Sequence, residues 1–322
     1  MKTRIVLVGC GYWGRHLFRV FRDRSDSRIV RVVDGAPLAV AFARERGVET
    51  TDVPDWTSAD AAVIATPPAS HARLAADALG AGLHVWVEKP LAMSSEEAAR
   101  LVGGAARQGR TLFVDHTFAY HPAVQELARR VRAGELGTLR GYDSERVHLG
   151  GVQPEVDVLW DLAPHDLAIL DEIARPRIAR VLAVATHSVN GQPTRAHATL
   201  FCDDGLVAHL RFDWRAPVKV RRVVVSGDRG SAVFDDSEAD EKLRLYDRGI
   251  VSPYEHRASY RLGEIRIPQI GTREALDVAA EEFLASIAEG RAPRTGGPEG
   301  LRSVQVLEAM ARSAREERTV TL

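Results

Sequence analysis

The stretch RIVLVGCGYWG, residues 4–14, decides the fold of the first half of the chain. Its apolar part, Arg4–Val8, predicts a short buried β-strand, and a helical spacing of apolar residues follows directly after the glycines. In such a unit Gly9 permits a tight turn, Gly11 lets the backbone approach a pyrophosphate, and Gly14 lets helix and strand pack closely. The stretch therefore predicts a dinucleotide-binding turn, rather than a glycine-rich turn without a ligand.

An acidic residue stands where the ribose of such a cofactor would be bound. Asp34 ends the next predicted strand, 20 residues after Gly14, and no Lys or Arg occurs in the following residues 35–38. A carboxylate at this place accepts hydrogen bonds from the ribose and would repel a 2′-phosphate. NAD is therefore predicted over NADP. Tyr12 and Trp13, which open the helix after the turn, are assigned to the same cofactor site.

The rhythm of strands and helices predicts two domains and an α/β fold class. Short strands alternate with helices over residues 1–118, which predicts an NAD-binding Rossmann domain with a doubly wound parallel sheet. Longer strand-like stretches joined by tight turns fill much of residues 119–322 and predict a large, mainly antiparallel open sheet in an α+β domain for substrate binding and oligomerisation. In this second part we expect strands at 140–148, 181–186, 196–201, 206–214, 220–225 and 231–234, and helices at 123–132, 162–173, 275–287 and 298–315.

Composition excludes several classes of function. The 322 residues include 43 basic and 44 acidic side chains, so the net charge of -1 offers no electrostatic case for nucleic acid or a membrane surface. The two cysteines, Cys10 and Cys202, are too few for a disulfide framework or a zinc cluster, and no other metal site is indicated. There is no signal-peptide pattern and no apolar run of ~20 residues, so we expect a cytoplasmic protein.

A lysine at a strand end is the first candidate for chemistry. Lys89 follows the predicted strand 84–87 within the sequence Glu88-Lys89-Pro90. Open α/β sheets bind ligands beyond the carboxyl ends of their strands, which favours a functional lysine over a surface lysine in a loop. We also expect the Lys89–Pro90 peptide bond to be cis, since X–Pro bonds adopt this form far more readily than others.

A second candidate lies in the other half of the chain. Asp161 and His165 are four residues apart, which places them on one face of a helix. Pro164 indicates the first helical turn, where a missing N–H costs little. Histidine suits acid–base work because its pKa lies near neutrality. The alternative is a buried histidine beside a capping aspartate.

Four motifs in this order resemble the Gfo/Idh/MocA family of oxidoreductases. They are the glycine turn, ATPPASH at 65–71, EKP at 88–90 and WDLAPHD at 160–166, and the resemblance covers essentially the whole chain. Residues 159–167 and 218–222 are most similar to the branch of nucleotide-sugar 3-dehydrogenases that act on UDP-linked N-acetylamino sugars or uronates.

The resemblance implies roles for the candidate residues. Lys89 would lie beside the reacting carbon, His165 would be the general acid or base, and Asp161 would bind a substrate hydroxyl. The chemistry of the reaction calls for the same residue types. When an alcohol loses a hydride its hydroxyl proton must also leave, so a base has to take that proton or a positive group has to stabilise the alkoxide.

Four further residues are assigned to the cofactor site. Thr66 and Pro67 are expected under the nicotinamide, and Glu88 is included with Lys89. His71 either approaches the cofactor or serves as a polar residue of the first helical turn.

Substrate contacts are expected in the second half. Alternation puts Lys219 and Arg221 on one face of a strand, where they would bind a diphosphate or carboxylate, unless this is a solvated strand edge. Tyr120 and His121 begin the second half and are also assigned to the substrate. Ala119 stands where many family members carry an arginine, which weakens the transfer of contacts in this loop.

The function expected is NAD-dependent oxidation of a secondary alcohol of a sugar, C3 of a nucleotide sugar in the first place. The alternatives are an inositol or free-sugar dehydrogenase, a 3-ketosugar reductase, an NAD-retaining glycosidase and a non-catalytic NAD-binding regulator. A homodimer or homotetramer is expected by analogy with relatives that pair such sheets, because large apolar sheet faces are rarely left exposed.

Overall fold

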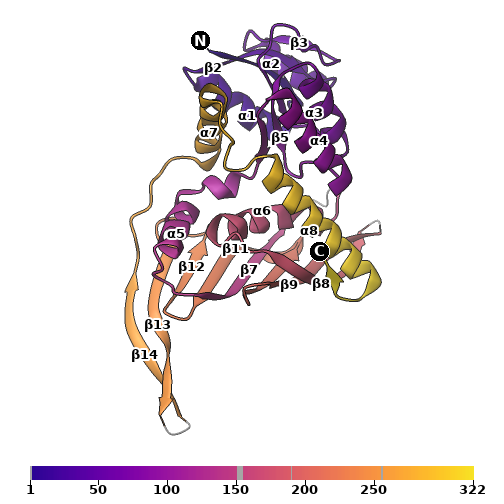
Figure 1. Ribbon diagram of the computed structural model, residues 1–322. Coiled ribbons are helices and arrows are strands. Elements are labelled where there is room, and N and C mark those ends of the chain that lie inside the picture. The colour runs from indigo at the N-terminus through magenta and orange to yellow at the C-terminus, as the bar shows by residue number, and fades with distance from the viewer. Residues whose placement is uncertain (1, 151–154, 190, 255–256) are drawn as a thin grey trace. The chain divides into compact units, whose positions relative to one another are not determined.

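The chain folds into two compact units (Figure 1). The structure is a computed structural model that describes residues 2–150, 155–189, 191–254 and 257–322. The first unit comprises Met1–Thr117 and Glu274–Gln305, and the second comprises Phe118–Arg273 and Val306–Leu322. Every helix among the described residues is too short or too polar to cross a lipid bilayer.

The first unit is built on a six-stranded sheet in the order β3-β2-β1-β4-β5-β6. Each strand pairs with its neighbours in parallel, and the apolar residues of the central strands are almost completely buried, as expected of a parallel sheet covered by helices. The strands are β1 (Thr3–Val8), β2 (Ser27–Val33), β3 (Glu49–Thr51), β4 (Ala61–Ile64), β5 (His84–Glu88) and β6 (Leu112–Asp115).

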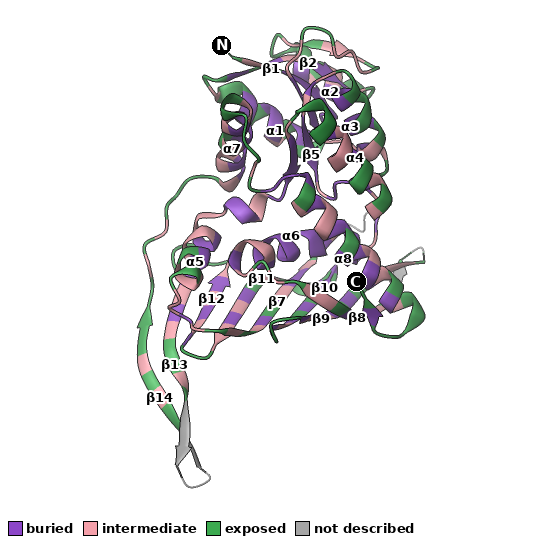
Figure 2. Cartoon of the chain, viewed as in Figure 1, coloured by how far each residue is buried: buried purple, intermediate pink, exposed green. Residues whose placement is uncertain are grey.

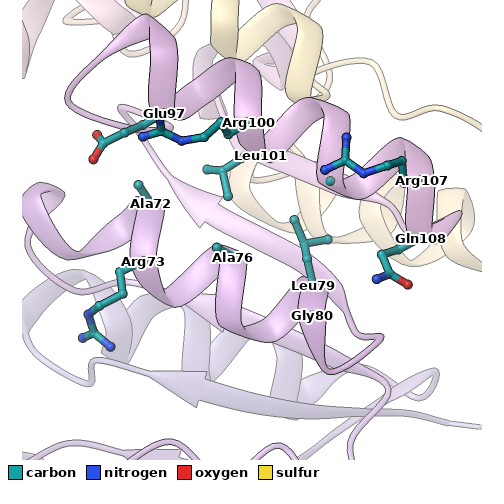
Figure 3. A pocket seen from close by; sticks show the side chains of 11 residues that line it. Ala72, Arg73, Ala76, Leu79, Gly80, Glu97, Arg100, Leu101, Arg107 and Gln108 are labelled. Atoms are coloured by element: carbon teal, nitrogen blue, oxygen red, sulfur yellow. The ribbon is translucent and has the colours of Figure 1, made fainter.

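Helices follow the strands of this sheet. The last of them before the second unit, α4, begins because Ser94 Oγ accepts a hydrogen bond from Glu97 N at 3.2 Å, and it ends at Gly109, whose φ is 59°. A shallow groove with arginines on its rim runs between α3 and α4 (Figure 3), and none of the site residues predicted above is among the described residues that line it. The helices are α1 (Tyr12–Asp23), α2 (Pro37–Arg44), η1 (Pro68–Ser70), α3 (His71–Gly80) and α4 (Ser95–Gln108).

Helix α7 (Ala275–Glu289) belongs to this first unit, although we expected all of 119–322 in the second domain. The physical reason is aromatic packing: the ring of Phe283 lies 5.6 Å from both Trp86 and Phe113, centroid to centroid. Thr295 also pairs with the edge of β6, donating from Oγ1 to Val114 O at 2.8 Å.

The second unit contains a nine-stranded sheet in the order β14-β13-β12-β11-β7-β10-β9-β8-β15. All pairings of neighbours are antiparallel except that of β10 with β7. The fold class expected from the sequence is therefore confirmed. The strands are β7 (Leu139–Leu149), β8 (Ile178–Val189), β9 (Gln192–Cys202), β10 (Val207–Asp213), β11 (Arg215–Gly227), β12 (Ser231–Asp235), β13 (Leu243–Tyr254), β14 (Arg257–Arg266) and β15 (Val320–Thr321).

Buried residues alternate with more exposed ones along the described parts of β9 and β10, so one face of the sheet there is buried and the other is open (Figure 2). Helices η2 (Thr117–Tyr120), α5 (Pro122–Arg132), α6 (Val158–Ile173) and α8 (Gly297–Glu316) complete the described helices. Apolar residues such as Val184, which is 57% exposed, lie on the open face. That this face pairs with a second copy in a homodimer or homotetramer stays a prediction.

Candidate functional site

The three glycines of the first turn differ in what surrounds them. A Cβ on Gly14 would lie 2.1 Å from Gly9 O, and a Cβ on Gly9, whose φ is 88°, would lie 2.6 Å from Ala65 O. A Cβ on Gly11 would meet nothing within 4 Å. Gly9 and Gly14 are thus required by the fold, whereas Gly11 leaves open space at the start of α1, where a pyrophosphate would approach the backbone.

Asp34 is held at the same turn. Its Oδ2 accepts a hydrogen bond from Cys10 N at 2.7 Å, and its Oδ1 accepts one from Ala36 N at 2.8 Å. The carboxylate therefore joins the glycine turn to the loop after β2. Tyr12 and Trp13 follow on α1 with exposed fractions of 83% and 37%, so Tyr12 in particular is open to a ligand.

His71 joins two loops at the ends of β4 and β5. Its Nδ1 lies 2.8 Å from Pro90 O and its Nε2 lies 2.8 Å from Thr66 O. The side chain is 1% exposed, and burial lowers its pKa. His71 thus positions the backbone around Thr66 and Pro90, and its assignment to the cofactor site, like that of Thr66 and Pro67, stays a prediction.

The strand end of β5 brings Lys89 to the carboxyl edge of the parallel sheet. The Lys89–Pro90 peptide bond is cis, which confirms the expectation. The preceding Glu88 is 8% exposed and accepts a hydrogen bond from the indole Nε1 of Trp13. Trp13 therefore connects the glycine turn to the segment that holds Lys89.

Sequence reasoning missed two buried neighbours of Lys89. Asp115 ends β6 opposite Glu88 and is 1% exposed, and burial raises the pKa of both carboxyl groups. His116 follows Asp115, and burial lowers its pKa to about 4, with the positive charges of Lys89 and Arg302 acting in the same direction. Neither residue belongs to a motif; the signal in the sequence was their place at the end of a parallel strand, next to the strand that ends in Glu88.

In the second unit, Asp161 and His165 lie one turn apart on α6. The expected first-turn position of Pro164 is wrong: α6 begins at Val158 and contains Pro164 in its interior. The start is set by Asp157, whose Oδ1 accepts hydrogen bonds from the backbone N–H groups of residues 159 and 160 at 2.9 and 3.0 Å. This N-cap was not predicted from the sequence.

Aromatic side chains hold this pair in place. Trp214 Nε1 donates a hydrogen bond to Asp161 Oδ2 at 3.2 Å. The ring of His165 meets Phe118 edge to face, with centroids 5.3 Å apart. Arg146 packs on the same Phe118, with Cζ 4.3 Å from the ring centroid.

A buried ion pair fixes α6 to β7. Arg146 binds both carboxylate oxygens of Asp166, from Nε at 2.7 Å and from Nη2 at 3.2 Å. Tyr142 OH donates to the backbone carbonyl of Asp166 at 3.0 Å. The helix that presents His165 therefore has a fixed rotation about its axis.

The four residues assigned to the substrate are placed differently. His121 Nε2 and Arg221 Nη1 both face Asp236, at 3.6 and 3.2 Å from its carboxylate oxygens. Tyr120 is buried, whereas Lys219 is exposed. The structure thus brings His121 and Arg221 together around a carboxylate that the sequence analysis did not single out.

His148 on β7 is another residue that we did not predict. Burial lowers its pKa first, and the charges of Arg221 and Lys219 lower it while that of Asp161 raises it. His148 therefore lies within electrostatic reach of both Asp161 and the basic strand β11. Its signal in the sequence was its position two residues after Arg146 on an alternating strand.

Comparison with known proteins agrees with this geometry. The model of an oxidoreductase family with an NAD-binding Rossmann fold matches residues 3–116, and that of the GFO/IDH/MocA C-terminal domain matches residues 124–233. The chain belongs to the Gfo/Idh/MocA oxidoreductases. It is therefore an NAD-binding enzyme of the dehydrogenase type, as the motifs predict.

Two named relatives cover nearly the whole chain. A UDP-N-acetylglucosamine 3-dehydrogenase of Acidithiobacillus ferrooxidans is 29% identical over 310 residues, which are 94% of each chain. A D-apiose dehydrogenase of Paraburkholderia graminis is 29% identical over 341 residues, covering 98% of this chain and 88% of the relative. A solved structure of the Acidithiobacillus ferrooxidans enzyme is similar with a TM-score of 0.85 at 25% identity, covering 98% of both chains.

Proposed function

We propose that this chain transfers a hydride between a secondary alcohol of a sugar, at C3 of a nucleotide sugar, and NAD. The observation that supports this best is the arrangement of the first unit. Gly11, Asp34 and Lys89 all follow the carboxyl ends of strands of one parallel sheet, which is the edge where such sheets bind ligands. The nucleotide turn and the candidate reactive lysine therefore share one edge.

The residues of each unit have separate tasks in this reaction. NAD, when bound, supplies the hydride acceptor. His165 takes the proton of the reacting hydroxyl, and Asp161, which accepts a hydrogen bond from Trp214, binds a substrate hydroxyl. Lys89 stabilises the negative charge that develops on the alcohol oxygen. Thr66, Pro67 and Tyr12 remain our candidates for cofactor contacts.

NAD is proposed over NADP on the position of Asp34. Its carboxylate lies at the glycine turn, so a 2′-phosphate bound there would meet a like charge. The nucleotide-sugar substrate is proposed from the similarity to a UDP-N-acetylglucosamine 3-dehydrogenase and from the basic residues of β11. Lys219 and Arg221 would bind the diphosphate.

Oxidation of a free sugar is the second candidate, and a specific observation favours it. Arg221 already faces Asp236, so part of its charge is neutralised without a diphosphate. The equal identity to a D-apiose dehydrogenase supports this alternative. Inositol dehydrogenase, 3-ketosugar reductase and NAD-retaining glycosidase activities remain outcomes of the same assay.

The assay follows NADH formation by purified protein with NAD, and with NADP in parallel. The panel holds UDP- and dTDP-linked sugars, free sugars and inositols. Turnover only with nucleotide sugars and NAD supports the proposal. Turnover with free sugars or inositols would contradict the proposal that the substrate is a nucleotide sugar. If no substrate yields NADH and the purified protein retains tightly bound NAD, an NAD-retaining glycosidase or a 3-ketosugar reductase is favoured.

Two substitutions test the catalytic residues on whichever substrate turns over. His165→Ala and Lys89→Ala are each expected to lower kcat at least about 10²-fold while NAD still binds, because each removes one positioned proton-transfer or charge-stabilising group. His209→Ala, at an exposed histidine of β10, is the matched control and should leave kcat unchanged. Near-normal kcat in either active-site variant removes that residue from the mechanism.

A further inference from the structure

The face of the nine-stranded sheet that packs against α6 carries a further histidine. Along β7, Tyr142 and Arg146 point toward α6, because Tyr142 donates to the backbone carbonyl of Asp166 and Arg146 binds its carboxylate. His148 comes two residues after Arg146 on the same strand, and alternate residues of a strand share one face. His148 therefore lies on the face that packs against α6, beyond Arg146 along the strand.

Trp214 connects this histidine to Asp161. In the parallel pairing of β7 with β10, Val147 lies opposite Asp213, so the residues that follow them, His148 and Trp214, are neighbours. Trp214 Nε1 donates a hydrogen bond to Asp161 Oδ2 at 3.2 Å. His148 and Asp161 thus adjoin the same tryptophan.

The direction of α6 agrees with this placement. Arg146 contacts Asp166, whereas Trp214, beside His148, contacts Asp161, which comes earlier in the helix. The helix therefore runs against the direction of β7, and its first turns lie over the end of the strand. His148 lies beneath the part of α6 that carries Asp161.

One nitrogen of the His148 ring is buried without a partner. Among the described residues, no group hydrogen-bonds to His148 Nδ1. Burial lowers the pKa of the ring, so the ring is neutral at pH 7 and carries one proton. Because buried N–H groups without an acceptor are rarer than acceptors without a donor, this proton belongs on Nε2.

The other nitrogen lies toward the accessible edge of the ring. The side chain is partly exposed although Nδ1 is buried. A Cβ on Gly150 would come within 2.4 Å of His148 Nε2, so the glycine leaves the space that this edge of the ring occupies. The Nε2–H group is thus a hydrogen-bond donor close to Asp161.

We propose that His148 is a further substrate-binding residue, whose Nε2–H donates a hydrogen bond to an uncharged oxygen of the sugar that does not react, a hydroxyl or an amide carbonyl. The inference rests on the proposed function for the ligand being a sugar. Asp161 accepts hydrogen bonds and His148 donates one, so together they recognise substituents of both kinds. A bond to a non-reacting oxygen strengthens binding of substrate and transition state alike, so its loss raises KM more than it lowers kcat.

Three substitutions separate the two ring nitrogens. His148→Gln brings an amide N–H to the place of Nε2, His148→Asn brings one to the place of Nδ1, and His148→Leu brings none. On whichever substrate turns over, His148→Gln should keep at least about a third of wild-type kcat/KM, whereas the other two should lose about tenfold, mainly through KM. His209→Leu, at an exposed histidine of the same sheet, is the matched control and should leave kcat/KM unchanged. Equal losses in all three variants would indicate a packing role and overturn the proposal.

Substrate analogues identify the oxygen that is bound. Analogues that lack one hydroxyl, or that carry a hydroxyl in place of an acetamido group, are compared in the wild type and in His148→Leu. The analogue without the bound oxygen should be about tenfold poorer for the wild type and no poorer for the variant. If every analogue loses as much in the variant as in the wild type, the hydrogen bond is not made and the proposal is overturned.

An NMR measurement tests the ring without catalysis. With ¹⁵N-labelled histidine, the free protein at neutral pH should show His148 with its proton on Nε2, in a signal that is absent from His148→Gln. A proton on Nδ1, or a charged ring, overturns the proposal. The UDP-linked sugars, free sugars and inositols of the activity panel are then added one at a time, and at least one should shift the Nε2 resonance of His148 but not that of His209.

The outcomes of this titration separate the inference from the proposed function. A shift of the His148 signal by a sugar that yields no NADH would support the binding role and contradict the proposed function. NADH formation from a sugar that leaves the His148 signal unchanged would support the function and overturn the binding role. If no compound of the panel shifts the signal, the proposal is likewise overturned.

Discussion

The two units bury charge in opposite ways. In the first unit, Glu88 and Asp115 place two acidic groups side by side at the ends of parallel strands. In the second unit, Arg146 and Asp166 place opposite charges in contact between a strand and a helix. Burial raises the pKa of both neighbouring carboxyl groups, whereas opposite charges in contact neutralise each other.

The difference assigns different tasks to the two clusters. Carboxyl groups whose pKa values are raised by burial respond to pH and to neighbouring charge, which suits the surroundings of Lys89. A carboxylate that accepts two charge-assisted bonds from one guanidinium is held in one orientation, which suits a scaffold that orients α6.

The largest effect is expected in the second unit. Arg146→Met leaves Asp166 buried without its partner and should lower the free energy of unfolding by about 3–5 kcal/mol. Urea unfolding followed by the fluorescence of Trp160 and Trp214 measures this change. Arg222→Met, at a half-exposed arginine of the same sheet that pairs with Glu145, should cost less than about 1 kcal/mol.

The double variant Arg146→Met/Asp166→Leu provides the contrast. Removing both charges should recover most of the stability that Arg146→Met loses, because no uncompensated charge remains. If the double variant is instead as unstable as the single one, packing of Arg146 on Phe118 is the larger contribution, and the charge comparison fails for this unit.

The sequence predicted those features that depend on neighbours along the chain. The glycine turn and the strand end at Lys89 each follow from a few consecutive residues. The hairpin of β13 and β14 was not predicted, because residues 243–266 mix charged and apolar side chains without the clear alternation of a half-buried strand.

Features that depend on distant neighbours escaped prediction. The meeting of Glu88 and Asp115 arises from strand pairing across 27 residues, and neither the motif at 88–90 nor any other includes Asp115. The start of α6 was predicted wrongly from Pro164, because prolines are common in the first turn of a helix. Here Asp157 caps the helix earlier in the chain. Helix α7 was placed by chain position, although Phe283 packs on Trp86.

A smaller effect is expected from His116 and depends on pH. Burial holds its pKa at about 4 in the folded chain, against an ordinary value of 6.5, so the unfolded chain binds a proton between these values and the folded chain does not. Stability should therefore fall as pH drops from about 6.5 to about 4, by up to about 3 kcal/mol at ~1.36 kcal/mol per pKa unit.

A substitution isolates this contribution. His116→Gln should remove that part of the pH dependence, measured as the unfolding free energy at several pH values in this range, while His209→Gln at an exposed histidine should retain it. An unchanged slope in His116→Gln would mean that His116 is protonated inside the fold. The first unit would then hold a buried positive charge beside Lys89.

The smallest effect tests whether the protonation of Asp115 changes with pH. Thr117→Val removes the hydroxyl that donates to Asp115 Oδ1 and should cost about 1–2 kcal/mol, whereas Thr117→Ser keeps the donor and should cost less. The hydroxyl lowers the pKa of Asp115 because it favours the ionised form, so the cost should be larger at about pH 8 than at about pH 5. Equal costs at both pH values would mean that the protonation of Asp115 does not change between them. The buried pair of the first unit would then not respond to pH in this range, and the contrast between the two units would be lost.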